Sequence, residues 1–171
     1  MLMLCLLRHA KSSWEDASVQ DFDRPLAPRG EAAAPRMGAY MADNGISPQL
    51  ILCSPAARTR QTLALLLPKL PGAATVEFEE GLYLASAGSL LARVRKIQAN
   101  TACLMIVGHD PGLHTLALEL AGRGEAADLR RLAHKFPTAG LAVISFKISQ
   151  WSKIKAKAGR LERFMSPRLL D

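Results

Sequence analysis

Two arginines and two histidines stand at or shortly after the ends of apolar runs that have the composition of buried strands. Arg8 and His9 follow the first such run. Arg58 lies in the first turn of a helix beyond the second run, and His109 follows a later one. Charged residues are common at single strand ends. Because parallel strands deliver their carboxyl ends to one edge of a sheet, however, we expect these four side chains to converge there.

Phosphoryl transfer is the chemistry that this set of side chains suits. The guanidinium groups of Arg8 and Arg58 present planar sets of N–H donors that match phosphate oxygens. A neutral His9 imidazole can attack phosphorus and carry the phosphoryl group, and neighbouring cations should lower its pKa and keep it neutral. His109 would donate a hydrogen bond to a phosphoryl oxygen, and water would then hydrolyse the phosphohistidine enzyme.

The elements that must position these residues alternate between strands and helices. This alternation, with several wholly apolar strands, predicts an α/β three-layer sandwich: a mainly parallel central sheet with helices on both faces and no cap domain. Pro35 should mark the first turn of its helix or kink it. We expect strands over Leu2–Leu7, Gln49–Cys53, Val76–Phe78, Ala102–Val107, Leu141–Ile148 and Arg160–Met165, and helices over residues 31–43, 56–67, 86–98 and 111–120.

Length and charge favour one nearly balanced domain with a basic end. The 171 residues fit a single domain, residues 1–171, and 49% of them are apolar. The net charge is +7, but residues 147–171 hold seven Lys and Arg against Glu162 and Asp171. The rest of the chain is therefore close to neutral, which argues against a nucleic-acid-binding protein. We also expect no membrane span and a cytoplasmic location, because no signal peptide or long apolar stretch is evident.

Several short segments of the chain resemble those of a known family. Leu7-Arg8-His9-Ala10 resembles the RHG signature of the histidine phosphatase (phosphoglycerate mutase-like) superfamily, with Ala10 in the glycine position. Residues 54–62 resemble its SPxxRxxQT segment, and Val107-Gly108-His109 matches its later strand-end histidine. The segment Asp21–Leu26, followed by Arg29-Gly30, is similar to the short branch of SixA-like phosphohistidine phosphatases, as is the ending from Trp151 to Arg168.

The resemblance assigns roles to the four core residues. It implies that His9 is the nucleophile and the phosphorylated intermediate, and that Arg8, Arg58 and His109 bind and polarise the phosphoryl group. It implies no metal and no cofactor. Lys11, which follows the signature, is a further candidate phosphate contact, as is its neighbour, Ser12.

Many members of the superfamily use a carboxylic acid to protonate the leaving oxygen. Glu79 and Glu80 are the candidates here, although a solvated charge pair at a strand end is the favoured interpretation of both. A site without this acid suits phosphohistidine, because a protonated imidazole leaves as a neutral ring whereas an alkoxide is a poor leaving group. The absence of an apparent cap insertion also favours an open pocket that admits a protein side chain.

Three functions follow from these residues. The first is a phosphohistidine phosphatase that acts on a phosphorylated protein, such as a histidine-containing phosphotransfer domain. The second is a phosphatase for a small phosphomonoester metabolite. The third, of another class, is a basic non-catalytic module that binds an acidic partner through residues 147–171. The sequence indicates no particular oligomeric state.

Overall fold

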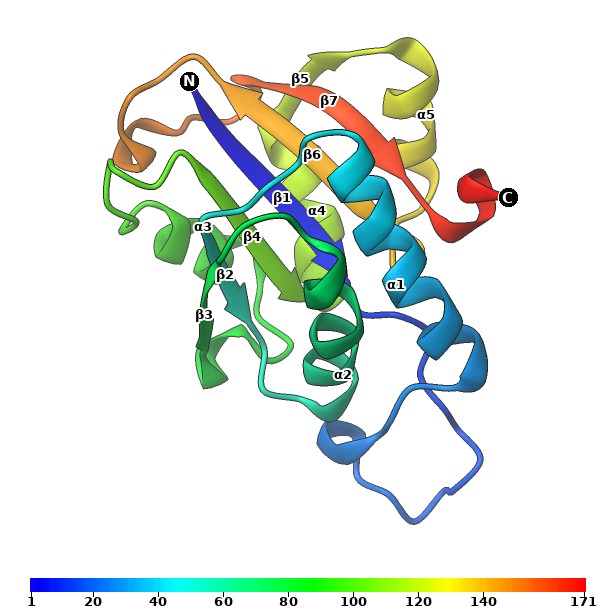
Figure 1. The fold of residues 1–171 in the computed structure, drawn as a ribbon. Coiled ribbons are helices and arrows are strands. Elements are labelled where there is room, and N and C mark those ends of the chain that lie inside the picture. Colours follow the sequence, from blue (N-terminus) through cyan, green and yellow to red (C-terminus); the bar gives the residue numbers. More distant parts are fainter.

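A seven-stranded sheet forms the centre of the computed structural model, which describes residues 1–171. The strand order is β3-β2-β4-β1-β6-β7-β5 (Figure 1). Four of the six strand pairings are parallel, and β6 runs antiparallel to both of its neighbours. The strands are β1 (Leu2–Arg8), β2 (Leu50–Cys53), β3 (Thr75–Phe78), β4 (Cys103–Gly108), β5 (Ala121–Gly124), β6 (Leu141–Phe146) and β7 (Gly159–Met165).

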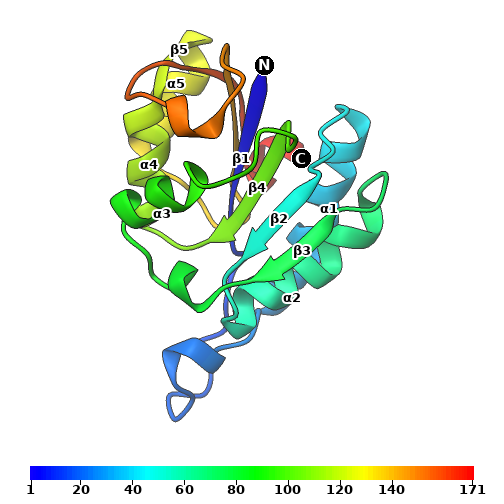
Figure 2. The ribbon, with the colours of Figure 1, turned by 90° about the vertical axis from the view of Figure 1, so that its left-hand side faces the viewer.

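Helices cover both faces of the sheet (Figures 1 and 2). α1 (Pro28–Asp43) and α2 (Ala57–Leu66) pack on one face, and α3 (Ala87–Val94), α4 (Gly112–Leu120) and α5 (Ala126–His134) pack on the other. The three-layer α/β sandwich with a mainly parallel sheet is therefore confirmed. No helix combines the length and the apolar character that crossing a membrane requires.

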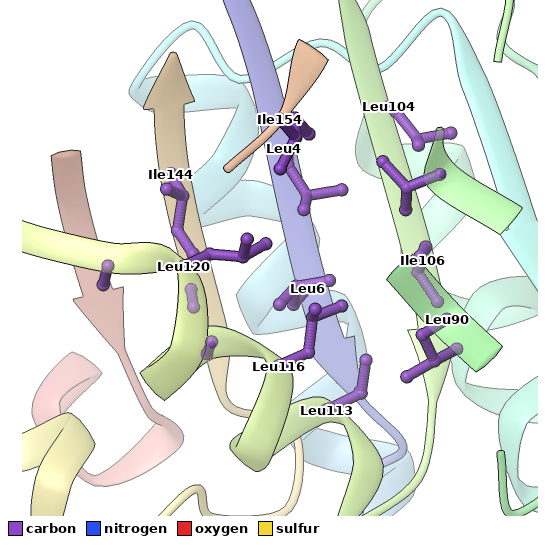
Figure 3. Close-up of a cluster of buried hydrophobic side chains, with 14 of the residues drawn as sticks. Leu4, Leu6, Leu90, Leu104, Ile106, Leu113, Leu116, Leu120, Ile144 and Ile154 are labelled. Atoms are coloured by element: carbon purple, nitrogen blue, oxygen red, sulfur yellow. The ribbon is translucent and has the colours of Figure 1, made fainter. Parts of the chain in front are cut away.

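The apolar run of β1 is continuous because both of its faces are covered. Leu4 and Leu6 point into the larger core cluster, while Cys5 and Leu7 point into the smaller one on the opposite face. Figure 3 shows the larger cluster, in which side chains of β1, β4 and β6 meet those of α3 and α4. The labelled residues are Leu4, Leu6, Leu90, Leu104, Ile106, Leu113, Leu116, Leu120, Ile144 and Ile154.

Two elements, β5 and α5, were not expected from the sequence. β5 has the sequence Ala-Gly-Arg-Gly, which lacks the apolar or β-branched residues that indicate a strand, and it forms only because β7 pairs with it at the sheet edge. The first turn of α1 is occupied by Pro28, and Pro35 lies in the interior of that helix. Of the two alternatives for Pro35, the first-turn position is therefore wrong, whereas a kink at this residue stays a prediction.

The basic segment 147–171 is built into the sheet. β7 lies between β6 and β5, with Leu161 and Phe164 buried, and the preceding segment buries Trp151 completely. Charged side chains lie between these buried ones along the strand, and the alternation is interrupted at the adjacent exposed residues Glu162 and Arg163, where the register with β6 shifts. Deleting the segment would thus remove a strand and part of the core, so truncation cannot isolate a binding function for it.

Candidate active site

His9 lies just beyond the carboxyl end of β1, with its ring held in one orientation. Only 6% of the residue is exposed. The backbone is fixed on both sides, since its N–H donates to Gly108 O (3.1 Å) and its carbonyl accepts from Ala139 N (2.9 Å). The ring Nδ1 lies 2.7 Å from Ala10 O, and a carbonyl can only accept, so Nδ1 carries the proton. In the neutral ring, Nε2 therefore carries the free lone pair.

His109 faces His9 from the end of the neighbouring strand, β4. The two ring centroids are 5.5 Å apart. The Nε2 atom of His109 lies 2.7 Å from Ser54 Oγ, at the end of β2, and its Nδ1 atom is buried without a hydrogen-bond partner in the protein. Three adjacent parallel strand ends thus meet here, as the apolar runs indicate.

Both rings are held in the neutral form. The pKa of His9 is lowered from 6.5 to about 3, chiefly because the ring is buried, and the positive charges of Arg58 and Arg8 add to this. The hydrogen bond to Ala10 acts in the opposite direction. Burial likewise lowers the pKa of His109 to about 4, again assisted by Arg58. A nucleophilic lone pair is therefore present on His9 at neutral pH.

Arg8 and Arg58 are anchored by protein contacts that use only part of their donor sets. Nη1 of Arg8 donates to Phe136 O at 2.9 Å and lies 3.5 Å from a carboxylate oxygen of Asp110. Arg58, which is 3% exposed, donates from Nη1 to the backbone carbonyl of Asp21 (2.6 Å) and from Nη2 to its carboxylate (3.1 Å). The Nε atoms of both arginines are buried and have no partner in the protein.

A third arginine, Arg24, enters the same cavity. It is buried, its Nη2 lies 3.2 Å from a carboxylate oxygen of Asp21, and its guanidinium carbon lies 3.4 Å from the centre of the Trp14 ring. Sequence reasoning missed Arg24 and Asp21 as site residues because neither follows an apolar run. The signal in the sequence was that both residues lie in the segment Asp21–Leu26, which resembles the SixA-like branch.

Residues 10–27 reach the site because the chain folds back beside Lys11. Ser12 and Leu26 form an antiparallel bridge, and Ala27 N donates to Lys11 O at 2.9 Å. A Cβ atom on Gly30 would lie 2.2 Å from Lys11 O, so the close approach of α1 requires glycine at this position. The segment projects beyond the carboxyl ends of β1, β2 and β4 (Figure 2).

The converging side chains surround a cavity of about 240 Å³. Most of its wall is polar or charged, which distinguishes it from an ordinary apolar ligand pocket. The lining residues are Arg8, His9, Lys11, Ser12, Trp14, Asp21, Arg24, Arg58, Leu84, His109, Asp110 and Thr138.

The predicted site residues divide into two groups. The four core residues line the cavity, together with Lys11 and Ser12. Glu79 and Glu80 do not: the carboxylate of Glu79 is bound by Arg93, with the closest contact at 2.7 Å, and Glu80 is exposed. The carboxylates in the cavity wall are instead Asp21 and Asp110.

These two carboxylates differ in their proton affinity. A hydrogen bond from Tyr83 lowers the pKa of Asp21, and hydrogen bonding and charge from Arg58 lower it further. Burial raises the pKa of Asp110, an effect opposed by Arg8. Asp21 is therefore an ionised partner of the arginines at neutral pH, and Asp110 is the carboxyl group more readily protonated.

Comparison with known proteins agrees with this geometry. Residues 4–91 match the family model of the histidine phosphatase superfamily (branch 1). An uncharacterized protein of Mycobacterium tuberculosis is 36% identical over 164 residues, which cover 95% of this chain and all of the relative.

Solved structures match over nearly the whole chain. A protein proposed to be the phosphohistidine phosphatase SixA of Agrobacterium tumefaciens is 31% identical, with a TM-score of 0.82 over 97% of this chain and 98% of its own. A second such protein, from Nakamurella multipartitia, is 28% identical, with a TM-score of 0.84 over 97% of this chain and 96% of its own. A phosphoserine phosphatase from Entamoeba histolytica, at 17% identity and a TM-score of 0.63 over all of both chains, shares the fold.

Proposed function

This chain belongs to the histidine phosphatase superfamily and is a phosphatase, and we propose that it removes the phosphoryl group from phosphohistidine on a protein through a covalent intermediate on His9. The proposed substrate is a phosphorylated protein such as a histidine-containing phosphotransfer domain. The similarity to two proteins proposed as SixA phosphohistidine phosphatases supports this choice of substrate.

The observation that carries the proposal is a set of buried nitrogen atoms without partners on the residues that line the cavity together with His9. Buried polar atoms in folded proteins nearly always have hydrogen-bond partners. Here several nitrogens of one cavity have none in the protein, and a phosphoryl group supplies the oxygens that would accept from them. These atoms are Arg8 Nε, Arg24 Nε and Nη1, Arg58 Nε and His109 Nδ1.

The proposed reaction has two displacements at phosphorus. In the first, Nε2 of His9 forms a bond to phosphorus while the bond from phosphorus to the substrate imidazole nitrogen breaks, and the protonated substrate ring leaves as neutral imidazole. In the second, water attacks the phosphoryl group on His9, inorganic phosphate leaves, and the free ring returns. Arg8 and Arg58 stabilise the charge on the equatorial oxygens during both steps.

The carboxylates bear on the choice between N–P and O–P bonds. Asp21 cannot serve as a proton donor at neutral pH, since its pKa is lowered. A phosphohistidine substrate needs no such donor, because its own ring proton serves. One observation favours the second candidate function, a phosphatase for a small phosphomonoester. Asp110 lines the cavity and its pKa is raised, so it would be the acid that protonates the leaving ester oxygen.

The test compares His9→Ala with the native protein on a histidine-phosphorylated phosphotransfer domain, on free phosphohistidine and on a panel of sugar and nucleotide phosphates. We expect native turnover to be highest on phosphohistidine, with a trapped acid-labile phosphoenzyme that is lost in His9→Ala. His134→Ala is the matched control, because His134 is exposed on α5. Turnover by His9→Ala would refute the mechanism, and a preference for small esters by orders of magnitude in kcat/KM would refute the substrate.

A further inference from the structure

Exposed apolar side chains gather at the entrance of the cavity. Six large hydrophobic residues of the chain are exposed, and Trp14, at 70%, and Leu84, at 56%, are two that line the cavity. A third, Phe22, at 37%, packs its ring 5.0 Å from that of Tyr83, which in turn lies 5.4 Å from the ring of His109. We call Trp14, Phe22 and Leu84 the apolar rim.

The backbone at Leu84 is held in a conformation that leucine disfavours. Its φ is +50°, in the left-handed region that glycine adopts without cost. The segment before α3 is pressed against the start of α4, where a Cβ atom on Gly112 would lie 2.0 Å from Ala85 O. Strain of this kind persists where the surrounding structure imposes it and is concentrated at functional sites. Leu84 thus combines an unfavourable backbone with an exposed side chain at the cavity entrance.

The cavity and its rim combine two kinds of surface. Inside, the side chains of Arg8, Arg24 and Arg58 provide positive charge that complements a phosphoryl group. Beside them, the apolar rim adds exposed non-polar surface next to the carboxylate of Asp21. A small phosphorylated metabolite has its hydroxyl and carboxyl groups close to the phosphate and gains nothing from such a rim. A phosphohistidine on a protein is instead surrounded by neighbouring side chains, and apolar neighbours would be buried against the rim.

We propose that the apolar rim of Trp14, Phe22 and Leu84 is the surface on which the phosphorylated protein docks, contacting apolar side chains that flank its phosphohistidine. This inference rests on the proposed function and adds to it the part of the chain that distinguishes a phosphohistidine on a protein from the free amino acid. The rim contributes to binding of the protein, whereas the arginines and His109 bind the phosphoryl group in either substrate.

The test measures kcat/KM for two substrates that share the same N–P bond: a histidine-phosphorylated phosphotransfer domain and free phosphohistidine. We expect Leu84→Gly and Phe22→Ala each to lower kcat/KM on the phosphorylated domain about tenfold, mainly through KM. On free phosphohistidine we expect a smaller loss, so the ratio of the two kcat/KM values falls in each variant. Leu84→Gly should not lower the melting temperature, because glycine relieves the positive φ, so a loss of activity is not a loss of folding.

Leu169→Ala is the matched control, since Leu169 is 42% exposed on the C-terminal turn and does not line the cavity. It should leave both substrates unaffected. Equal effects of Leu84→Gly on the two substrates, or no effect on either, would overturn the docking surface while leaving the phosphatase intact. The docking surface would also be overturned if sedimentation of the native protein and Leu84→Gly showed that the rim joins two copies of the chain. If the native protein instead turns over free phosphohistidine but no phosphorylated protein, the proposed protein substrate itself fails.

Discussion

Acid should destabilise this protein through His9, and the size of the effect follows from the burial of the ring. The pKa of His9 is lowered from 6.5 to about 3 in the folded chain, where the residue is only 6% exposed. Below pH 6.5 the unfolded chain therefore binds a proton that the folded chain does not, so stability falls as pH falls. At pH 5.0 the difference amounts to about 2 kcal/mol in the free energy of unfolding.

His9→Gln removes this contribution and should flatten the pH dependence. The free energy of unfolding is measured by urea denaturation at pH 7.5 and pH 5.0, in buffers without phosphate or sulfate, because a bound anion would favour protonation of the ring. We expect the native protein to lose about 2 kcal/mol more than His9→Gln between the two values. Burial also lowers the pKa of His109 to about 4, so His109 lowers the free energy of unfolding on acidification in both proteins. This contribution cancels when the two proteins are compared.

Exposed His134 provides the control, and His134→Gln should follow the native curve. If His9→Gln and the native protein lose the same stability between pH 7.5 and pH 5.0, then the ring of His9 is not held neutral by burial. The account of its nucleophilicity would then be wrong, whatever the activity of the enzyme.

Two further predictions concern the segment that completes the cavity. Gly30→Ala should destabilise the fold by about 2 kcal/mol or more and lower activity, because its Cβ would lie 2.2 Å from Lys11 O. Gly88→Ala, whose Cβ would meet only Ser86 Oγ at 4.0 Å, should not destabilise the fold in the same denaturation experiment. Arg24→Gln should raise the inhibition constant of inorganic phosphate about tenfold, the cost of about one hydrogen bond to a charged group. An unchanged constant would remove Arg24 from the phosphate site, and exposed Arg36→Gln is the control.

The positions of most strands along the chain and the convergence of the core residues could be predicted because their signals are local. Continuous apolar runs indicate strands covered on both faces, and the residues just after such runs must lie at the carboxyl edge of the sheet. The pairing of β1 with β4 places Arg8 opposite Gly108, so His9 and His109 are neighbours as soon as the two strands pair in parallel. The apolar runs predict that both histidines lie at one edge of the sheet, and the pairing of β1 with β4 makes them neighbours.

The approach of Arg24 and Asp21 could not be predicted in this way. Their position depends on how residues 10–27 fold back, and that path is set by the Ser12–Leu26 bridge and by the close contact of Gly30 with Lys11. The predicted acids lie outside the cavity because of another contact between distant residues. The carboxylate of Glu79 is occupied by Arg93, 14 residues further along the chain on α3, and a sequence offers no sign of such a pair.

By itself, the sequence determined most strands of the sheet and the placement of His9, Arg8 and Arg58 at its carboxyl edge, because burial of an apolar strand fixes what stands at its end. Only the tertiary structure decided the protonation of His9, the third arginine and the exposed rim at Leu84. Each of these depends on which side chains from distant segments exclude water, contribute charge or leave a surface uncovered. Those properties arise from the packing of segments on one another and have no local pattern.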